Sequence, residues 1–283
     1  MLVNRSLNFK KVAVTGCTGG LGKEICISLL AYGAELIMLD RNEIKAEKLE
    51  TELKNTFKDA KITRIKIELE DMNSVKAATD KLLELSIDVF IENAGAYSIP
   101  RHICTSSYDN IFQINFVSPY YMALKLSEKL KNIKIVAVGS IAHTYGKINE
   151  NDIDFKNVKS AAKAYGNSKR FLMLALSEMF RENPECLSIA HPGITFTNIT
   201  AHYPKLIFAI IKHPMKIIFM KPKKAAKCII EGVFDHTEHG TLIGPRIFNI
   251  WGKPKKMRFK AAFTEDSKKA VNIADKIIDK LNI

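Results

Sequence analysis

From Lys11 to Ala190, short apolar runs alternate with longer segments that have helical spacing. The runs are of strand length and rich in Val and Ile, and they occupy residues 11–15, 36–39, 63–69, 88–91, 134–138 and 187–190. Between them, helical segments are predicted at 21–32, 43–57, 74–85, 108–130 and 162–180. Strands that alternate with helices form right-handed crossover units, which build a parallel sheet with helices on both faces. The alternation therefore predicts an α/β fold.

After His191 the pattern changes, although no linker or repeat separates this part from the rest. Residues 199–220 are apolar but are interrupted by lysines and by Pro204 and Pro214, which excludes one straight helix. The remaining predicted elements are a helix at 223–234, a last strand at 241–244 and a closing amphipathic helix marked by Val271, Ala274, Ile278 and Leu281. We expect residues 1–283 to form a single domain around a doubly wound parallel sheet of about seven strands.

A glycine-rich loop follows the first apolar run directly and precedes the first helical segment. Its glycines are Gly16, Gly19, Gly20 and Gly22. Such a loop lets the backbone approach a pyrophosphate, and the helix N-terminus behind it offers free N–H groups to the anion. A glycine-rich turn without a ligand is the alternative, but the strand–loop–helix order favours a dinucleotide site in a Rossmann-like sheet.

Asp40 ends the second apolar run and is followed by Arg41. A carboxylate at this point accepts hydrogen bonds from the adenosine ribose and repels a 2′-phosphate, so Asp40 favours NAD. The neighbouring guanidinium could instead clamp a 2′-phosphate, which leaves NADP open. The simpler alternative is that Asp40 caps the next helix.

Tyr165 and Lys169 are four residues apart in a helical segment, so their side chains share one face. A phenol with a pKa near 10 is a poor acid–base catalyst at neutral pH, and a neighbouring ammonium lowers that pKa. Alone, this spacing also describes many solvated surface pairs.

Several further motifs stand in order around this pair, and with them the chain resembles the short-chain dehydrogenase/reductase family over nearly its whole length. The matching motifs are the loop 15–22, Asn93-Ala94-Gly95, Asn115, Ser140, the Tyr165/Lys169 pair, and Pro192-Gly193-Ile194 with Thr197. The resemblance implies hydride transfer between a nicotinamide cofactor and a carbonyl or alcohol. Tyr165 would be the general acid/base, Ser140 would bind the substrate oxygen, Lys169 would bind ribose, and Asn115 would hold a relay water.

The resemblance also implies the remaining cofactor contacts. They are Gly16, Thr18, Gly20, Leu21 and Gly22 around the pyrophosphate, Asp40, Arg41, Glu68 and Leu69 around adenosine, Asn93, Ala94 and Gly95 on the floor, and Pro192, Gly193, Ile194 and Thr197 around the nicotinamide. Three residues depart from the family pattern, and one of them is Asp40, which stands where NADP-preferring relatives commonly have a small residue before the arginine. Glu68 replaces the usual aspartate, and Glu92 replaces an asparagine, a change expected to affect strand packing without touching the chemistry.

Within the family, the segment 140–147 is most similar to the retinol-dehydrogenase-like branch, which suggests a lipophilic small-molecule substrate. A catalytically silent dinucleotide-binding protein is the alternative from another class, although such a protein would not need the Ser140, Tyr165 and Lys169 set. Relatives commonly form homodimers or homotetramers through the helices at 108–130 and 162–180. The resemblance extends that expectation to this chain.

Positive charge gathers near the C-terminus. The formal net charge is +13, and residues 203–283 hold 17 Lys or Arg against seven Asp or Glu. Residues 198–228 are predicted to form a substrate lid, and 203–227 could instead lie on an anionic membrane surface as a peripheral segment. Nucleic acid is not expected, because the charge is not combined with aromatic residues interleaved on a strand platform. The five scattered cysteines predict a reducing, cytoplasmic setting, and no metal site is expected.

Overall fold

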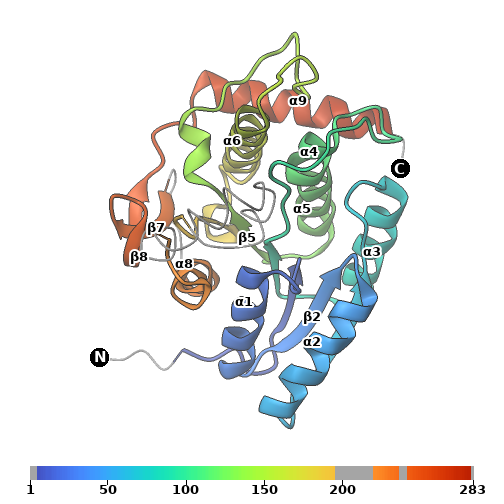
Figure 1. The fold of residues 1–283 in the computed structure, drawn as a ribbon, viewed down its shortest axis with the longest axis vertical. Helices are drawn as coiled ribbons and strands as arrows, with labels where there is room; N and C mark the ends of the chain where they lie inside the picture. The colour runs from blue at the N-terminus through green and yellow to red at the C-terminus, as the bar shows by residue number, and fades with distance from the viewer. Residues whose placement is uncertain (1–4, 195–218, 236–240, 282–283) are drawn as a thin grey trace, which may run out of the picture.

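An eight-stranded sheet forms the centre of the computed structural model, which describes residues 5–194, 219–235 and 241–281 (Figure 1). The strand order is β3-β2-β1-β4-β5-β6-β7-β8, parallel up to β7 and antiparallel between β7 and β8. The strands are β1 (Lys11–Thr15), β2 (Glu35–Asp40), β3 (Ile62–Lys66), β4 (Val89–Glu92), β5 (Lys134–Val138), β6 (Leu187–Ala190), β7 (Thr241–Ile247) and β8 (Trp251–Arg258). The predicted doubly wound α/β fold is confirmed.

The eighth strand, β8, was not predicted, and it corrects the expected strand count. Its sequence is rich in lysine and lacks an apolar run, and most of its residues are exposed or half-exposed. An edge strand pairs on one side only, so it can carry charged residues that would be excluded from the centre of a sheet. Hydrophobic patterning therefore cannot detect it.

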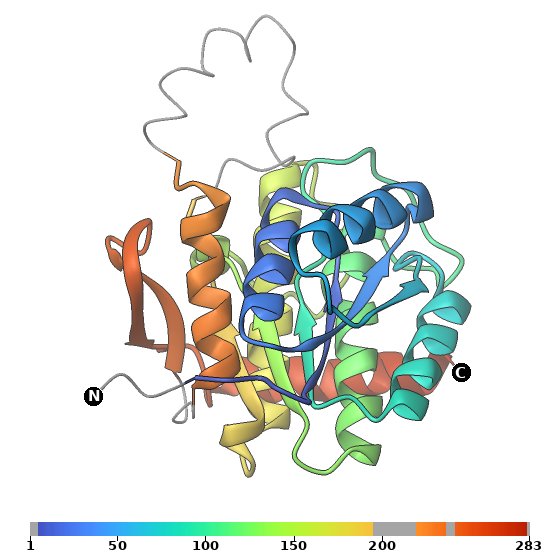
Figure 2. The ribbon, with the colours of Figure 1, turned by 90° about the horizontal axis from the view of Figure 1, so that it is seen from below.

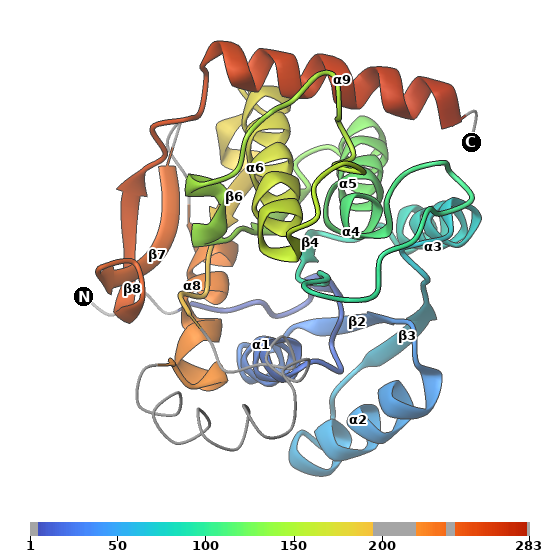
Figure 3. The same cartoon turned by 45° about the horizontal axis from the view of Figure 1, so that its top comes forward.

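Helices cover both faces of the sheet (Figures 2 and 3). They are α1 (Gly20–Ala31), α2 (Glu43–Thr56), α3 (Met72–Leu85), α4 (Asn110–Phe112), α5 (Ser118–Lys129), α6 (Ala161–Met179), α8 (Pro222–Phe234) and α9 (Glu265–Leu281). One face packs against α1, α2 and α8, and the opposite face packs against α3, α5 and α6, with a separate hydrophobic core on each side. The two cores explain why the central parallel strands are largely apolar, whereas β3 at the edge carries exposed Thr63, Arg64 and Lys66.

Side chains alternate between these two cores along each strand. In β4, Val89 and Ile91 belong to the core under α1 and α8, whereas Phe90 belongs to the core under α5 and α6. Because successive residues of a strand point to opposite faces, the side chain of Glu92 faces the same helices as Phe90.

The helix predicted over 108–130 is interrupted. A π-helical turn, Gln113–Val117, separates α4 from α5, and Pro119 stands in the first turn of α5. Single π turns inside helices are frequent at functional sites. This one contains Asn115, which the sequence singled out.

The C-terminal helix α9 crosses the outer surface of α6 and reaches α5 (Figure 1). Its buried residues recur at three- and four-residue intervals and are Ser267, Ala270, Ala274, Ile277 and Ile278. Two polar contacts fix its position, since Tyr120 Oη donates to Asp275 Oδ1 at 2.7 Å and Arg170 Nη2 lies 2.8 Å from Asp266 Oδ2.

The sheet reverses its winding between β1 and β4, because β2 and β3 lie on one side of β1 and β4 to β7 lie on the other. Ligands of such sheets bind outside the carboxyl ends of the strands at this switch point. Among the described residues, no helix has the length and apolar character needed to cross a membrane.

Candidate active site

The glycine loop between β1 and α1 has a shape that two of its glycines make possible. Gly16 has a φ of +70°, which favours glycine, and its N–H donates to Leu39 O at 2.8 Å. A Cβ on Gly22 would lie 2.1 Å from Gly16 O, so the helix can start this close to the loop only with glycine there. Both residues hold the turn tightly against the sheet.

The outer side of the same loop is open. A Cβ on Gly20 would meet nothing among the described residues closer than Pro222 Cγ, at 3.9 Å. Gly19 caps α1 without a side chain, so no side-chain oxygen satisfies the first N–H groups of the helix. Leu21, the next residue of α1, is half-buried. An accessible backbone and an uncapped helix N-terminus fit the pyrophosphate of a dinucleotide.

The segment Asn93-Ala94-Gly95 ties the end of β4 to the end of β1. Asn93 Nδ2 donates to Thr15 O at 2.9 Å and to Gly16 O at 3.1 Å, and Ala94 N donates to Thr15 Oγ1 at 3.0 Å. These bonds hold the glycine loop over the strand ends, and the role of the segment as the floor of a cofactor site stays a prediction.

Asp40 is buried and faces the glycine loop. Its Oδ1 accepts from Thr18 N at 3.0 Å and from Thr18 Oγ1 at 2.8 Å, while Oδ2 has no partner. Burial raises the pKa of Asp40. Asn42 caps α2 by accepting from Lys45 N, so the alternative that Asp40 is the helix cap is wrong. Arg41, in contrast, is exposed, and its Nε lies 3.7 Å from Glu68 Oε2.

The turn between β3 and α3 carries Glu68 and Leu69, which are also predicted to contact adenosine. Ser74 Oγ accepts from Glu68 N at 2.9 Å, and Ser118 Oγ donates to Leu69 O at 2.6 Å. Leu69 is buried and Glu68 is half-exposed. The backbone of this turn is therefore fixed from both α3 and α5.

Ser140 and Tyr165 come together from different elements. Ser140 follows β5 and caps the short 3₁₀ turn Ile141–Thr144, and Tyr165 lies in the second turn of α6. Their side chains are close enough for the Ser140 hydroxyl to lower the pKa of Tyr165. Burial acts more strongly in the opposite direction and raises the pKa of Tyr165 to about 12.

Lys169, one turn further along α6, is fully buried. Its Nζ donates to Val138 O at 3.0 Å and lies beside Gly95, where a Cβ would be 3.6 Å away. Burial lowers the pKa of Lys169 to about 8, and the charge of Glu92 opposes that shift. Lys169 is not among the groups that shift the Tyr165 pKa in this structure, so its expected effect on the phenol stays a prediction.

Asn115 joins the π turn to the segment after Gly95. Its Nδ2 donates to Ala96 O at 2.8 Å, and its Oδ1 accepts from Ala96 N at 2.9 Å. The side chain is completely buried and thus fixes the backbone beside the floor. A relay water at Asn115 stays a prediction.

Two tyrosines that sequence reasoning missed surround the candidate catalytic group. The ring of Tyr97 contacts the ring of Tyr165 edge to face, with centroids 5.1 Å apart. The ring of Tyr145 lies over Gly166, where a Cβ would be 2.4 Å from Tyr145 Cε2. Both lie in loops next to motifs that resemble those of the family. Their spacing in the sequence gives no indication that they lie near Tyr165.

The segment after β6 is only partly described. Gly193 has a φ of +75°, and a Cβ there would lie 2.5 Å from Ile250 O, so the turn requires glycine beside Pro192. Ile194 O accepts from Met220 N at 2.8 Å. His191 is buried with a pKa lowered to about 4, as expected for a packed residue. Thr197 lies outside the described residues.

Most of the predicted lid and basic segment also lies outside the described residues, which resume at Phe219. The described part of the basic segment places four exposed lysines at the start of α8, at positions Lys221, Lys223, Lys224 and Lys227. Because Pro222 lies beside Gly20, this charge stands next to the glycine loop.

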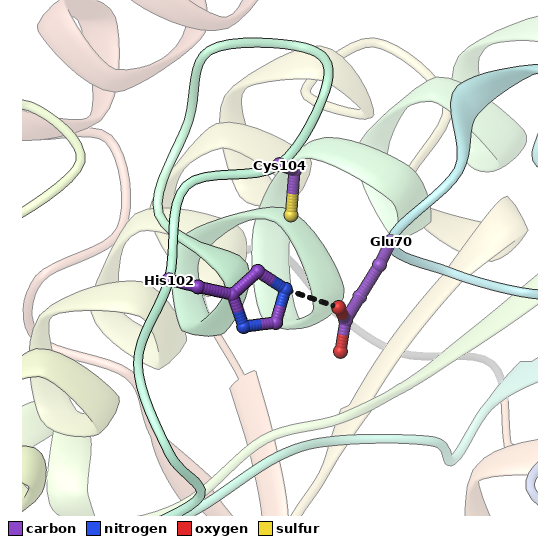
Figure 4. Close-up of side chains that lie close together, drawn as sticks. All are labelled: Glu70, His102 and Cys104. Atoms are coloured by element: carbon purple, nitrogen blue, oxygen red, sulfur yellow. Dashed lines mark ion pairs between the residues drawn. The ribbon is translucent and has the colours of Figure 1, made fainter.

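A separate cluster joins the loop after β4 to the turn after β3 (Figure 4). The ligand-type atoms of Glu70, His102 and Cys104 lie within 4.8 Å of one another, and His102 Nε2 is 2.8 Å from Glu70 Oε2. Asn110 Nδ2, a donor that also binds Pro100 O, lies 3.1 Å from His102 Nδ1. With Nδ1 as the acceptor from Asn110, Nε2 carries the hydrogen that is donated to Glu70, so both ring nitrogens have partners within the protein. The cluster links the loop after β4 to the turn after β3.

Comparisons with known proteins agree with this architecture. The family model for short chain dehydrogenases matches residues 10–204. Retinol dehydrogenase 12 of Mus musculus is 29% identical over 199 residues, covering 68% of this chain and 63% of that protein. Retinol dehydrogenase 14 of Mus musculus is 28% identical over 211 residues, with the same coverage. The chain thus spans less than two thirds of the length of these relatives.

Solved structures show the same fold. A crystal structure of a protein from Mycobacterium paratuberculosis superimposes with a TM-score of 0.72 at 22% identity, covering 98% of this chain and 94% of that one. The NADPH-dependent 3-quinuclidinone reductase of Rhodotorula rubra gives a TM-score of 0.64 at 19% identity, covering 83% and 90%. With a family model that matches more than half of its residues, the chain belongs to the short-chain dehydrogenase family.

Proposed function

We propose that this chain is an NAD(P)-dependent oxidoreductase that interconverts a carbonyl and an alcohol, with Tyr165 as the general acid/base. The observation that supports this most directly is the convergence of Ser140 and Tyr165, whose side chains interact, with Lys169 one helical turn away. These groups lie at the carboxyl ends of the central strands, near a glycine loop that fits a dinucleotide. When bound, the nicotinamide would donate or accept the hydride.

Ser140 and Tyr165 have different roles in the transfer of one proton. Ser140 holds the substrate oxygen by a hydrogen bond, and Tyr165 gives its hydroxyl proton to that oxygen as the carbonyl is reduced, or takes it back in the reverse direction. A phenol with a pKa of about 12 exchanges its proton slowly near neutral pH. Turnover therefore needs a positive charge close to Tyr165, and Lys169 is the candidate on the same helix.

We infer further that the substrate is lipophilic. The ring of Tyr97 contacts the ring of Tyr165, and the exposed Tyr145 lies over Gly166, the next residue of α6, so aromatic surface lies beside the reacting residue. Aromatic side chains bind apolar and conjugated groups well. The two retinol dehydrogenases among the relatives agree with a substrate of this class.

The proposal is tested with a panel of lipophilic aldehydes, ketones and alcohols, assayed with both dinucleotides by absorbance of the reduced nicotinamide. We expect turnover of at least one carbonyl–alcohol pair. Tight binding of a dinucleotide without turnover of any substrate would favour the alternative of a silent binding protein. Failure to bind either dinucleotide would contradict both.

The choice between NAD and NADP is proposed to depend on Asp40. Its carboxylate lies beside the glycine loop, where negative charge disfavours a 2′-phosphate. Asp40→Asn is expected to improve NADPH affinity relative to NADH by about tenfold, because it removes about 1.4 kcal/mol of repulsion. The measurement is the ratio of the two dissociation constants.

Thr18→Val is the matched control, since it removes the hydroxyl that donates to Asp40 and keeps the charge. It is expected to weaken both cofactors alike and leave the ratio unchanged. An Asp40→Asn ratio equal to that of the wild type would contradict a role of this charge in cofactor choice.

A further inference from the structure

The side chain of Glu92 is a buried carboxyl group without a partner. It is 3% exposed, and neither of its oxygens has a hydrogen-bond partner. Burial of an unpaired carboxyl group is costly, and such groups are rare in folded proteins unless they have a function. The family pattern has an asparagine here, so the chain carries an acid where a neutral side chain would suffice.

Strand register places Glu92 close to the site of Lys169. Glu92 faces the α5 and α6 side of the sheet, and it pairs with Ala137 on the neighbouring strand β5. The next residue of β5 is Val138, whose carbonyl oxygen accepts the hydrogen bond from Lys169 Nζ. The carboxyl group and the ammonium group therefore lie over the ends of adjacent strands, in the same buried layer.

The charge of each group shifts the pKa of the other. No other charged group among the described residues contributes to either shift. Burial raises the pKa of Glu92 to about 8, and the charge of Lys169 opposes the shift. Burial lowers the pKa of Lys169 to about 8, and the charge of Glu92 opposes that shift. In a low-dielectric interior such a coupling extends beyond hydrogen-bond distance.

We propose that Glu92 is a positioning residue for the proposed reaction, a buried counter-charge that keeps Lys169 in its ammonium form against Val138 and within reach of the Tyr165 phenol. The inference rests on the proposed function. Protons leave a coupled pair in two steps. In the proposed order Glu92 loses its proton first, and the resulting carboxylate, close to the ammonium, then opposes loss of the second proton. The ammonium thus persists at the higher pH at which the phenol must release its proton.

Glu92→Gln tests the proposal because it keeps the shape of the side chain and removes the charge. In the direction of alcohol oxidation, the midpoint of the pH–kcat profile is expected to move upward by about one pH unit, since Lys169 loses its proton earlier and no longer favours the phenolate. The KM for the dinucleotide is expected to stay within about twofold, because a neutral amine still donates to ribose hydroxyls. Glu92→Asp, which restores a charge, is expected to return the midpoint toward the wild-type value.

Glu84→Gln is the control, because it removes an exposed carboxylate from α3 and leaves the buried layer intact. A purely structural role of Glu92 would lower kcat or stability without moving the midpoint. An unmoved midpoint in an active Glu92→Gln enzyme would overturn the inference and leave the proposed function standing.

A second measurement does not depend on turnover. The folded-state pKa of Glu92 lies above its unfolded value, so its contribution to stability is present at low pH and is lost as the pH rises toward 8. Urea unfolding from pH 5 to 8 should therefore show a flatter decline for Glu92→Gln than for Glu84→Gln. Equal slopes would show that folding does not raise the pKa of Glu92, which contradicts the coupled titration proposed for the pair. A flatter slope in a protein without any turnover would support the buried pair and contradict the proposed function.

Discussion

Tyr165→Phe is expected to lower kcat by about 10²- to 10⁴-fold, the range attributed to general acid–base catalysis. The substitution removes the hydroxyl that interacts with Ser140 and leaves the ring, with its edge-to-face contact to Tyr97, in place. The fold and the glycine loop do not depend on this hydroxyl. Dinucleotide affinity is therefore expected to stay within about threefold, less than 1 kcal/mol.

The measurement combines steady-state kinetics with a dinucleotide titration by fluorescence. Tyr32→Phe is the matched control, because Tyr32 lies at the C-terminal end of α1 against Phe234, on the side of the sheet away from the carboxyl ends of the strands. It is expected to keep wild-type kcat. Full activity of Tyr165→Phe would refute the proposed mechanism, and loss of dinucleotide binding would show that the hydroxyl has a different role.

Gly22→Ala is expected to destabilise the free protein and to abolish dinucleotide binding. The added Cβ would lie 2.1 Å from Gly16 O and 2.8 Å from Cys17 Cα, and both are backbone atoms that cannot rotate away. Overpacking of this kind costs about 1–3 kcal/mol or more. The helix must move away from the loop, which destroys the tight turn that faces the pyrophosphate.

Gly20→Ala separates the two effects of Gly22→Ala. A Cβ on Gly20 meets no described atom within 3.8 Å, so the free protein is expected to keep its melting temperature. If a pyrophosphate lies over this backbone, the same methyl group obstructs it, and the dissociation constant should rise by about tenfold or more. Thermal unfolding and titration of both variants measure the two effects. Unchanged affinity in Gly20→Ala would place the dinucleotide elsewhere.

The sequence was most informative where two faces of a strand are buried. The bounds of β1, β5 and β6 agree residue for residue with the predicted runs, because a central parallel strand must be apolar throughout. The π turn around Asn115 and the edge strand β8 were missed, since neither changes the hydrophobic pattern in a recognisable way.

The candidate site was predictable as a set of positions but not as a set of contacts. Motif order places Ser140, Tyr165 and the glycine loop at the same edge of the sheet. Motif order does not predict where the side chains point. Asp40 accepts a hydrogen bond from Thr18, and the charge of Glu92 raises the pKa of Lys169, whereas only an effect on strand packing was expected. Such contacts depend on how residues distant in sequence pack, which spacing within a motif does not determine.

The docking of α9 has a consequence for self-assembly. The resemblance to the family led us to expect that two copies would associate through the outer sides of α5 and α6, but each chain covers much of that surface with its own C-terminal helix. A dimer built there would have to displace α9, together with the Tyr120–Asp275 and Arg170–Asp266 contacts. A chain that ends before Glu265 would lack α9 and expose the apolar strip that this helix covers. Neighbouring molecules could bind to that strip, so removal of the helix should promote self-association.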